Sequence, residues 1–128
     1  MALVEAIGVV HRARREEDVV ISAMGAAREW MALGTRPLDW VFVPSSMGQA
    51  TALGLGLALA RPDRRIIVLN GDGGMLMNLG SLVTISACAP ANLVILLFDK
   101  VSTRSPARSR RRPLRAPARM TPTSTSPP

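Results

Sequence analysis

The chain has 128 residues and a formal net charge of +7, which allows one domain with a moderate core. Residues 1–99 carry eight Arg and nine acidic residues, whereas residues 100–128 carry Lys100, seven Arg and no acid. The basic character therefore belongs to the C-terminal segment alone. The single cysteine, Cys88, excludes an intrachain disulfide framework, and its apolar neighbours predict a buried thiol.

The N-terminus has no basic segment followed by an apolar stretch, so the sequence predicts no secretory signal and a cytoplasmic protein. Two long stretches without charge, 41–60 and 73–98, are interrupted by proline, glycine and amide or hydroxyl side chains. Such interruptions are typical of buried helices and strands joined by turns, and we expect no membrane span.

Apolar periodicity and turn residues predict helices that alternate with strands. In chain order we expect a helix over 3–15, a strand over 19–21, a helix over 24–31, a strand over 40–43, a helix over 47–60, a strand over 66–69, a helix over 75–87 and a strand over 93–98. Ser46 is the expected N-cap of the helix over 47–60. Because the strands are continuous apolar runs, the expected fold class is α/β, a parallel sheet with helices on both faces.

Residues 1–99 are expected to form this domain, and residues 100–128 a disordered basic tail. Residues 101–128 contain seven Arg, six Pro, five Ser and four Thr, and no aromatic residue. Such a composition cannot bury a core. Within the domain, Gly54 and Gly56 each weaken their helix by about 1 kcal/mol relative to Ala. Close packing against the sheet or another chain is the expected compensation.

Ligands of parallel sheets bind at the carboxyl ends of the strands. Three turns with small residues are expected there: Met24-Gly25-Ala26, Ser45-Ser46-Met47-Gly48 and Gly71-Asp72-Gly73-Gly74. They could converge on one cofactor.

The third turn carries the strongest chemical signal. Its glycines let backbone N–H groups approach an anion at the start of a helix. A carboxylate such as Asp72 would repel a phosphate unless a hard divalent cation lies between them, so the turn predicts a metal–diphosphate site with Asp72 as a metal ligand. The local sequence leaves an ordinary Asp-Gly turn as an equal alternative.

Residues 71–82 resemble the diphosphate-binding signature of thiamine-diphosphate-dependent enzymes, most closely the sulfopyruvate and phosphonopyruvate decarboxylase group. Residues 45–48, followed by Gly54-Leu55-Gly56-Leu57-Ala58, are similar to the loop and helix under the thiazolium ring in that group. The similarity runs from about Val4 to Asp99. It implies thiamine diphosphate and Mg²⁺ as cofactors and decarboxylation of a 2-oxo acid as the reaction.

The resemblance also assigns roles within the three turns. Asp72 would hold the metal, and Gly71, Gly73 and Gly74 would present backbone groups to the diphosphate. The Ser45 carbonyl would accept a hydrogen bond from the aminopyrimidine, Met47 would bend the cofactor, and Ser46 and Gly48 would complete that loop. Gly25 and Ala26 would border the diphosphate.

The chain departs from the family pattern at Lys100, where an asparagine that binds the metal is expected. A protonated lysine cannot ligate Mg²⁺. The composition changes at the same place, which predicts a truncation or a shift of reading frame after Asp99. Translation of the encoding DNA in the other two frames tests this hypothesis.

In the family, a glutamate from a separate pyrimidine-binding domain activates the cofactor, and we expect this chain to be only the diphosphate-binding half. The resemblance therefore implies a partner subunit or a homo-oligomer, and a chain that is inactive alone. Three alternatives stay open: a non-catalytic remnant, an acetolactate-type carboligase subunit, and non-specific nucleic-acid binding through the basic tail. The last is disfavoured because the tail has no aromatic residue for base stacking.

Four further side chains are assigned to packing or solvent rather than to chemistry. His11 is expected to be exposed, and Trp30 and Trp40 are expected to be packing rather than stacking groups. Asn78 is expected to be a partly buried helix residue, with a polar group behind the site as the alternative.

Overall fold

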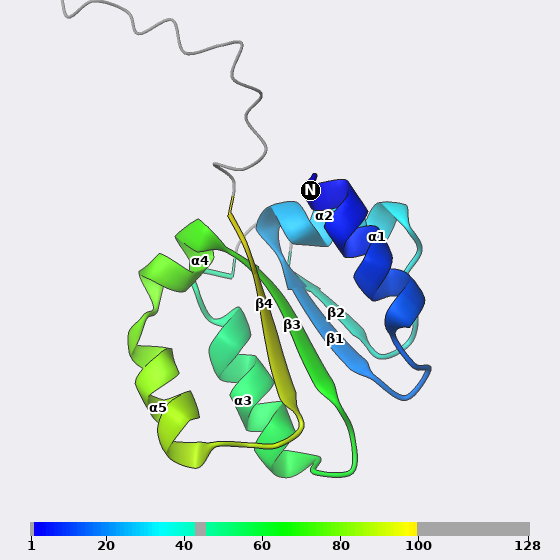
Figure 1. The fold of residues 1–128 in the computed structure, drawn as a ribbon. Helices are drawn as coiled ribbons and strands as arrows, with labels where there is room; N and C mark the ends of the chain where they lie inside the picture. Colours follow the sequence, from blue (N-terminus) through cyan, green and yellow to red (C-terminus); the bar gives the residue numbers. More distant parts are fainter. Residues whose placement is uncertain (1, 43–45, 100–128) are drawn as a thin grey trace, which may run out of the picture.

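The computed structural model describes residues 2–42 and 46–99 and consists of helices that alternate with parallel strands (Figure 1). In chain order the elements are α1 (Leu3–Ala13), β1 (Val19–Ala23), α2 (Met24–Ala32), β2 (Asp39–Phe42), α3 (Ala50–Ala60), β3 (Ile66–Gly71), α4 (Asp72–Met77), α5 (Gly80–Cys88) and β4 (Leu93–Phe98). The four predicted strands are all present. The prediction of an α/β fold with a parallel sheet is confirmed.

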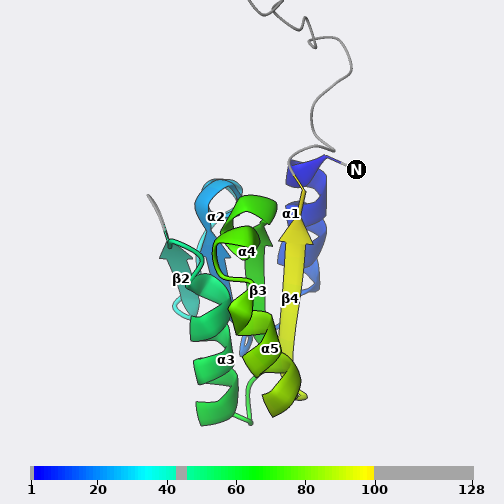
Figure 2. The ribbon, with the colours of Figure 1, turned by 90° about the vertical axis from the view of Figure 1, so that its left-hand side faces the viewer.

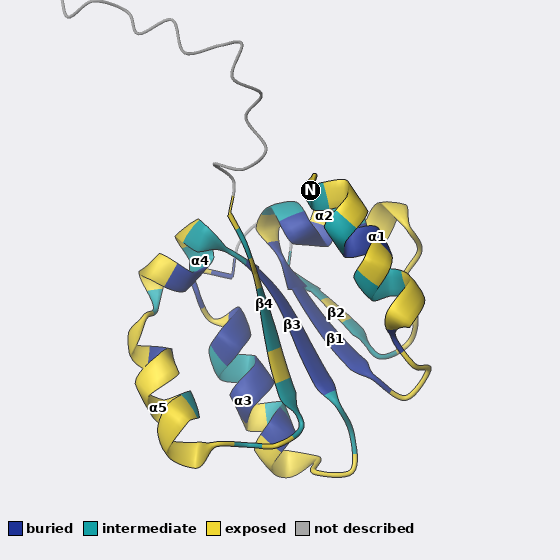
Figure 3. Cartoon of the chain, in the orientation of Figure 1, coloured by how far each residue is buried: buried dark blue, intermediate teal, exposed yellow. Residues whose placement is uncertain are grey.

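The described strands form one sheet in the order β2-β1-β3-β4, and every neighbouring pair is parallel. The central strands β1 and β3 are almost fully buried, whereas β2 and β4 at the two edges are partly exposed (Figure 3). The apolar runs are therefore explained by helices on both faces of the sheet.

Two apolar clusters hold the layers together. On one face, α1 and α2 contribute Ile7 and Trp30, which pack against Val20 and Leu69. On the other face, α3 packs on the alternate side chains of β1 and β3, such as Ile21 and Val68. Residues along a strand alternate between the faces, so each central strand supplies both clusters.

Three predicted helix boundaries are wrong. The first helix ends at Ala13, because Arg14 turns inward and pairs with the buried carboxylate of Asp39. The third helix begins at Ala50 with Gln49 as its N-cap, so Ser46 is not the cap, and residues 47–49 form a turn.

The predicted helix over 75–87 begins earlier and is broken in two at Asn78. The Asn78 Nδ2 donates to the Gly48 carbonyl oxygen at 3.3 Å, and the Ser81 hydroxyl donates to the Asn78 carbonyl oxygen at 2.8 Å. Asn78 is therefore a half-buried link between two loops and not a helix residue.

Several single-residue expectations are also corrected. Cys88 is exposed. His11 is half-buried, and its Nε2 lies 3.0 Å from the Gly34 carbonyl oxygen. Trp30 is fully buried, as a packing group would be, but Trp40 is an exposed edge residue. Within the described part of the chain, no helix is long and apolar enough to cross a membrane. The predictions for residues 100–128 lie outside the described residues.

Candidate functional site

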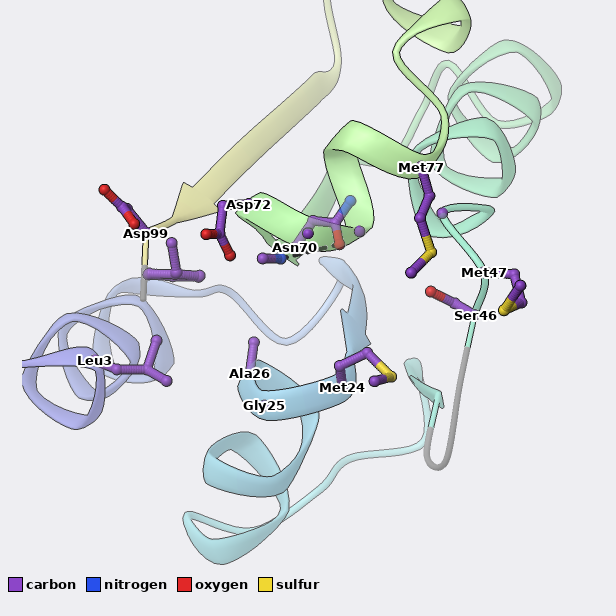
Figure 4. A pocket seen from close by; sticks show the side chains of 15 residues that line it. Leu3, Met24, Gly25, Ala26, Ser46, Met47, Asn70, Asp72, Met77 and Asp99 are labelled. Carbon is purple, nitrogen blue, oxygen red and sulfur yellow. Dashed lines mark hydrogen bonds between the residues drawn. The ribbon is translucent and has the colours of Figure 1, made fainter. Parts of the chain in front are cut away.

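A cavity of about 210 Å³ lies at the carboxyl ends of the strands. Its walls come from the starts of α2 and α4, the loop before α3, the end of β4 and the first residue of α1 (Figure 4). The predicted site residues that line it are Gly25, Ala26, Ser46, Met47, Gly48, Gly71, Asp72, Gly73 and Gly74. The remaining one, Ser45, lies outside the described residues. The structure thus brings three turns that are distant in sequence to one cavity.

The turn from β3 into α4 is held by a buried amide. Asn70 is 1% exposed, and its Oδ1 accepts a hydrogen bond from the Gly71 N–H at 3.0 Å. A Cβ on Gly74 would lie 2.4 Å from this Oδ1 atom. Any other residue at position 74 would force the buried Asn70 side chain to move, because the helix backbone lies directly against it. The Asn70 Nδ2 has no hydrogen-bond partner in the described structure, although a buried donor normally has one.

The loop before α3 reaches the same cavity through two residues with positive φ. Met47 has φ +46° and Gly48 has φ +79°. A Cβ on Gly48 would lie 2.9 Å from the Gly74 carbonyl oxygen and 2.9 Å from the Asn78 Cβ. The loop therefore contacts the start and the end of α4. A left-handed non-glycine residue such as Met47 is costly for the backbone and often occurs at functional sites.

The sequence did not assign six of the lining residues to the site: Leu3, Met24, Asn70, Met77, Phe98 and Asp99. Met24 also has a positive φ, of 55°, at the turn from β1 into α2. The sequence could have indicated three of them: Met24 belongs to the first predicted turn, Asn70 directly precedes the third, and Asp99 follows the carboxyl end of the last predicted strand. Leu3 and Phe98 carry no such signal, because only the packing of α1 against the end of the sheet brings them near.

The cavity is divided chemically. Asp72 and Asp99 lie toward one end, and the thioether side chains of Met47 and Met77 lie toward the other (Figure 4). No Lys or Arg is among the described residues that line it. A bare polyanion would be repelled by the two carboxylates, so an anionic ligand would need a cation beside it. The apolar end is suited to an uncharged ring.

Asp72 could contribute one carboxylate to a metal site, because it begins α4 at the wall of the cavity. Within residues 2–42 and 46–99, no group of three or more His, Cys, Asp or Glu side chains is arranged to hold a metal ion. A metal at Asp72 would therefore need other oxygen ligands, such as phosphate oxygens and water.

Comparison with known proteins identifies a family whose match to this chain contains all three turns at the cavity. Residues 23–103 match the family described as thiamine pyrophosphate enzyme, C-terminal TPP binding domain. The sulfopyruvate decarboxylase subunit beta of Methanothermobacter thermautotrophicus is 46% identical over 85 residues, which are 66% of this chain and 45% of that protein. The phosphonopyruvate decarboxylase of Streptomyces viridochromogenes is 44% identical over 85 residues, 66% of this chain and 21% of that protein.

A more distant similarity extends to acetolactate synthase isozyme 1 large subunit of Escherichia coli, with 30% identity over 76 residues, 56% of this chain and 14% of that protein. The chain spans less than half the length of each of these relatives. The matched residues include β2, β3, β4 and all three turns at the cavity. The chain therefore belongs to the thiamine pyrophosphate enzymes, through their C-terminal TPP binding domain.

Proposed function

We propose that this chain binds thiamine diphosphate with Mg²⁺ and serves as the diphosphate-binding subunit of a 2-oxo acid decarboxylase of the sulfopyruvate or phosphonopyruvate type. The observation that carries the proposal is the meeting of residues 71–74 with Met47, Gly48, Gly25 and Ala26 around one cavity. The names of the relatives with 44–46% identity support the reaction class.

The described residues fit this cofactor in two respects. First, the glycine turn offers backbone groups without side chains in the way: Gly73 has no atom within 4 Å of where a Cβ would lie, and Gly71 has only one, at 3.9 Å. Second, the side chains of Met47 and Met77 form an apolar wall at one end of the cavity, against which a ring of the cofactor could pack. Ser46 and the undescribed Ser45 would border the same ring.

Asp72 would hold the Mg²⁺ that joins the diphosphate to the protein. With Asp99 at the same end of the cavity, the diphosphate alone would meet two carboxylates, so we expect its binding to require the metal. Lys100 stands where the family has its second side-chain ligand, so we expect a weaker complex than an asparagine would allow.

When bound, thiamine diphosphate supplies the electron sink for the loss of CO₂ from a 2-oxo acid. The described residues would bind and orient it, but none of them is placed to act on the aminopyrimidine as an acid or base: the titratable groups at the cavity are Asp72 and Asp99, both at the diphosphate end. We therefore expect no turnover without a partner that supplies a carboxylate there. The name "subunit beta" of one relative supports a second subunit.

The acetolactate-type alternative is less favoured because that relative is only 30% identical. A non-catalytic remnant and non-specific nucleic-acid binding are not supported by any feature of the described residues. Cofactor binding by the purified chain distinguishes the proposed function from a non-catalytic remnant.

Calorimetric titration of thiamine diphosphate into the purified chain, with and without Mg²⁺, tests the proposal. We expect binding only with Mg²⁺ and its loss in Asp72→Ala. Asp63→Ala is the matched control, because Asp63 is an exposed carboxylate that does not line the cavity. Absence of binding by a chain that circular dichroism shows to be folded would contradict the proposal and favour the remnant.

A further inference from the structure

The loop before α3 holds two consecutive residues in the left-handed region. The Gln49 N–H donates to the Ser46 carbonyl oxygen at 2.8 Å, and the two residues that this turn encloses, Met47 and Gly48, have φ values of +46° and +79°. Positive φ at both central positions is the pattern of a type I′ turn, in which Gly, Asn and Asp are the usual residues. Met47 is none of these, so its conformation has an energetic cost that contacts elsewhere must offset.

Burial of the Met47 side chain supplies little of this compensation. The side chain is 67% exposed, and it lies with Met77 at the apolar end of the cavity (Figure 4). A strained residue in a core would instead gain free energy from the apolar area that it buries. The left-handed turn therefore presents Met47 to the cavity, and the contacts that stabilise the turn are to be found at its other central residue, Gly48.

A set of hydrogen bonds from three side chains reaches the loop at Gly48. Asn78, at the break between α4 and α5, donates from Nδ2 to the Gly48 carbonyl oxygen at 3.3 Å. The Ser81 hydroxyl donates to the Asn78 carbonyl oxygen at 2.8 Å, and the hydroxyl oxygens of Ser81 and Thr51 lie 3.0 Å apart. Both hydroxyl residues are buried. They come from α5 and α3, which lie side by side on one face of the sheet (Figure 2).

The protons of the two hydroxyl groups determine the direction of these bonds. Each hydroxyl has one proton to donate. Ser81 donates its proton to the Asn78 carbonyl oxygen, which can only accept, so Thr51 is the donor in the contact between the two hydroxyls. Thr51 then has no proton for the Gly48 carbonyl oxygen, which lies 3.5 Å from its Oγ1 atom. Asn78 is therefore the side chain that holds the Gly48 carbonyl in the described structure.

Steric contact joins the loop to the glycine turn, residues 71–74, at the same point. A Cβ on Gly48 would lie 2.9 Å from the Gly74 carbonyl oxygen and 3.1 Å from the Met77 Cβ. The backbone of the loop thus lies against α4, while the Asn78 amide holds the adjoining carbonyl. Gly48 therefore links the two ends of the cavity, and a displacement of its carbonyl would move Met47 relative to the glycine turn.

We propose that Asn78 is a positioning residue for the cofactor. It fixes the Gly48 carbonyl, and through it the left-handed Met47, at the distance from the glycine turn that the ring of the cofactor requires. Thr51 and Ser81 act through Asn78, because their hydrogen bonds set its orientation. The inference rests on the proposed function. It concerns the ring alone, since a ligand that consists only of phosphate groups would bind at the glycine turn without reaching Met47.

Calorimetric titration of two ligands, each with Mg²⁺, separates positioning from a purely structural role. Thiamine diphosphate has the ring, and inorganic pyrophosphate lacks it. Asn78→Leu keeps the approximate shape of the side chain and removes its donor. We expect this variant to bind thiamine diphosphate about 10-fold more weakly than wild type, as the loss of one hydrogen bond implies, and to bind pyrophosphate equally well. Equal losses for both ligands, or no loss for either, would overturn the proposal.

Asn92→Leu is the matched control. Asn92 also links separate segments through its amide, but at the end of the sheet opposite the cavity. Its Nδ2 donates to the carbonyl oxygens of Ala58, Arg61 and Arg64. We expect Asn92→Leu to lower the midpoint of chemical denaturation and to leave both affinities unchanged. A selective loss of thiamine diphosphate binding in this control would mean that any destabilisation weakens ring binding, and would overturn the role of Asn78.

The Met47 methyl group gives a second readout that needs no cofactor. In the magnetic resonance spectrum of a chain with isotope-labelled methionine methyl groups, Met47→Leu identifies the Met47 signal. We expect Asn78→Leu to shift this signal and Asn92→Leu to leave it in place. Ser81→Ala, a milder variant that removes the bond to the Asn78 carbonyl, should shift it in the same direction and remains informative if Asn78→Leu does not fold.

The two readouts distinguish failure of this inference from failure of the proposed function. A wild-type chain that binds neither ligand would contradict the proposed function, whereas the methyl signal would still show whether Asn78 positions Met47. A Met47 signal that is identical in wild type, Asn78→Leu and Ser81→Ala would overturn the inference, even in a chain that binds thiamine diphosphate.

Discussion

At the scale of single residues, the cavity depends on glycines that other residues cannot replace. Gly48 combines a positive φ with close contacts to the Gly74 carbonyl oxygen and the side chains of Met77 and Asn78. Gly73 lies in the neighbouring turn and has open space around it. The reasons for these glycines therefore differ. At positions 48 and 74 a side chain would meet neighbouring atoms, whereas at position 73 there is open space, and access of a ligand to the backbone is the proposed reason.

We expect Gly48→Ala to lower the free energy of unfolding by about 1–3 kcal/mol, because alanine is strained at this φ and its Cβ would meet backbone. Chemical denaturation measures the effect. Gly73→Ala is the matched control and should change stability by less than about 1 kcal/mol. Equal losses in the two variants would contradict this interpretation of Gly48.

At the scale of secondary-structure elements, α3 contains two glycines in different surroundings. A Cβ on Gly54 would lie 2.4 Å from the Val68 Cγ2 atom of β3, whereas one on Gly56 would meet nothing within 4 Å. The expected compensation for a helical glycine is thus present at Gly54, where the helix lies close against the sheet. The same compensation is absent at Gly56 within the described structure.

This difference predicts opposite effects of alanine. Gly54→Ala should lower the free energy of unfolding by about 1–3 kcal/mol, because overpacking against Val68 exceeds the gain in helix propensity. Gly56→Ala should raise it by about 0.5–1 kcal/mol. Thermal and denaturant unfolding of both variants measure these changes in the free energy of unfolding. Destabilisation by Gly56→Ala would indicate that this face of α3 is covered, for example by another chain.

At the scale of the whole molecule, ion pairs join elements at the end of the sheet opposite the cavity. The buried carboxylate of Asp18, just before β1, accepts hydrogen bonds from the Arg65 guanidinium, just before β3, and from the Arg15 N–H at 2.7 Å. Burial raises the pKa of Asp18, but the bonds from Arg65 and Arg15 outweigh it and hold the pKa below its usual value. The pair thus ties the two central strands together.

The lowered pKa predicts a dependence of stability on pH. Since the carboxylate is favoured in the folded state, its contribution is complete above the unfolded pKa, about 3.9, and is lost as the pH falls through the lower folded pKa. Asp18→Asn should therefore destabilise the chain by about 1–3 kcal/mol at neutral pH, and the difference from wild type should shrink below about pH 4. Denaturation at several pH values measures it.

Asp63→Asn is the control for this experiment. The hydrogen bond from Arg61 lowers the pKa of Asp63 to about 2, but both side chains are half-exposed, so solvent screens the pair. We expect little change of stability with this variant. If Asp18→Asn changes the free energy of unfolding as little as Asp63→Asn at every pH, the Asp18–Arg65 pair does not stabilise the folded chain.

Much of the fold and of the site is local in origin and could be predicted. The strands are mostly apolar runs of four to six residues, and most of the connections between elements carry a glycine or a proline. The turn 71–74 could be identified because it occurs together with residues 45–48, in the order and on the elements that the family has; Gly-Asp-Gly alone would fit an ordinary turn equally well. Its convergence with residues 25–26 and 46–48 followed from the rule that parallel strands end at one edge.

The sequence by itself thus determined the order of helices and strands, the parallel sheet and the turns that line the cavity. Only the tertiary structure decided that the helix after the glycine turn breaks at Asn78, that Arg14 turns inward to Asp39, and that Met24 and Met47 take left-handed conformations. The physical reason is the same in each case. These features depend on contacts between residues distant in sequence, whose energies exceed the local preferences of the chain.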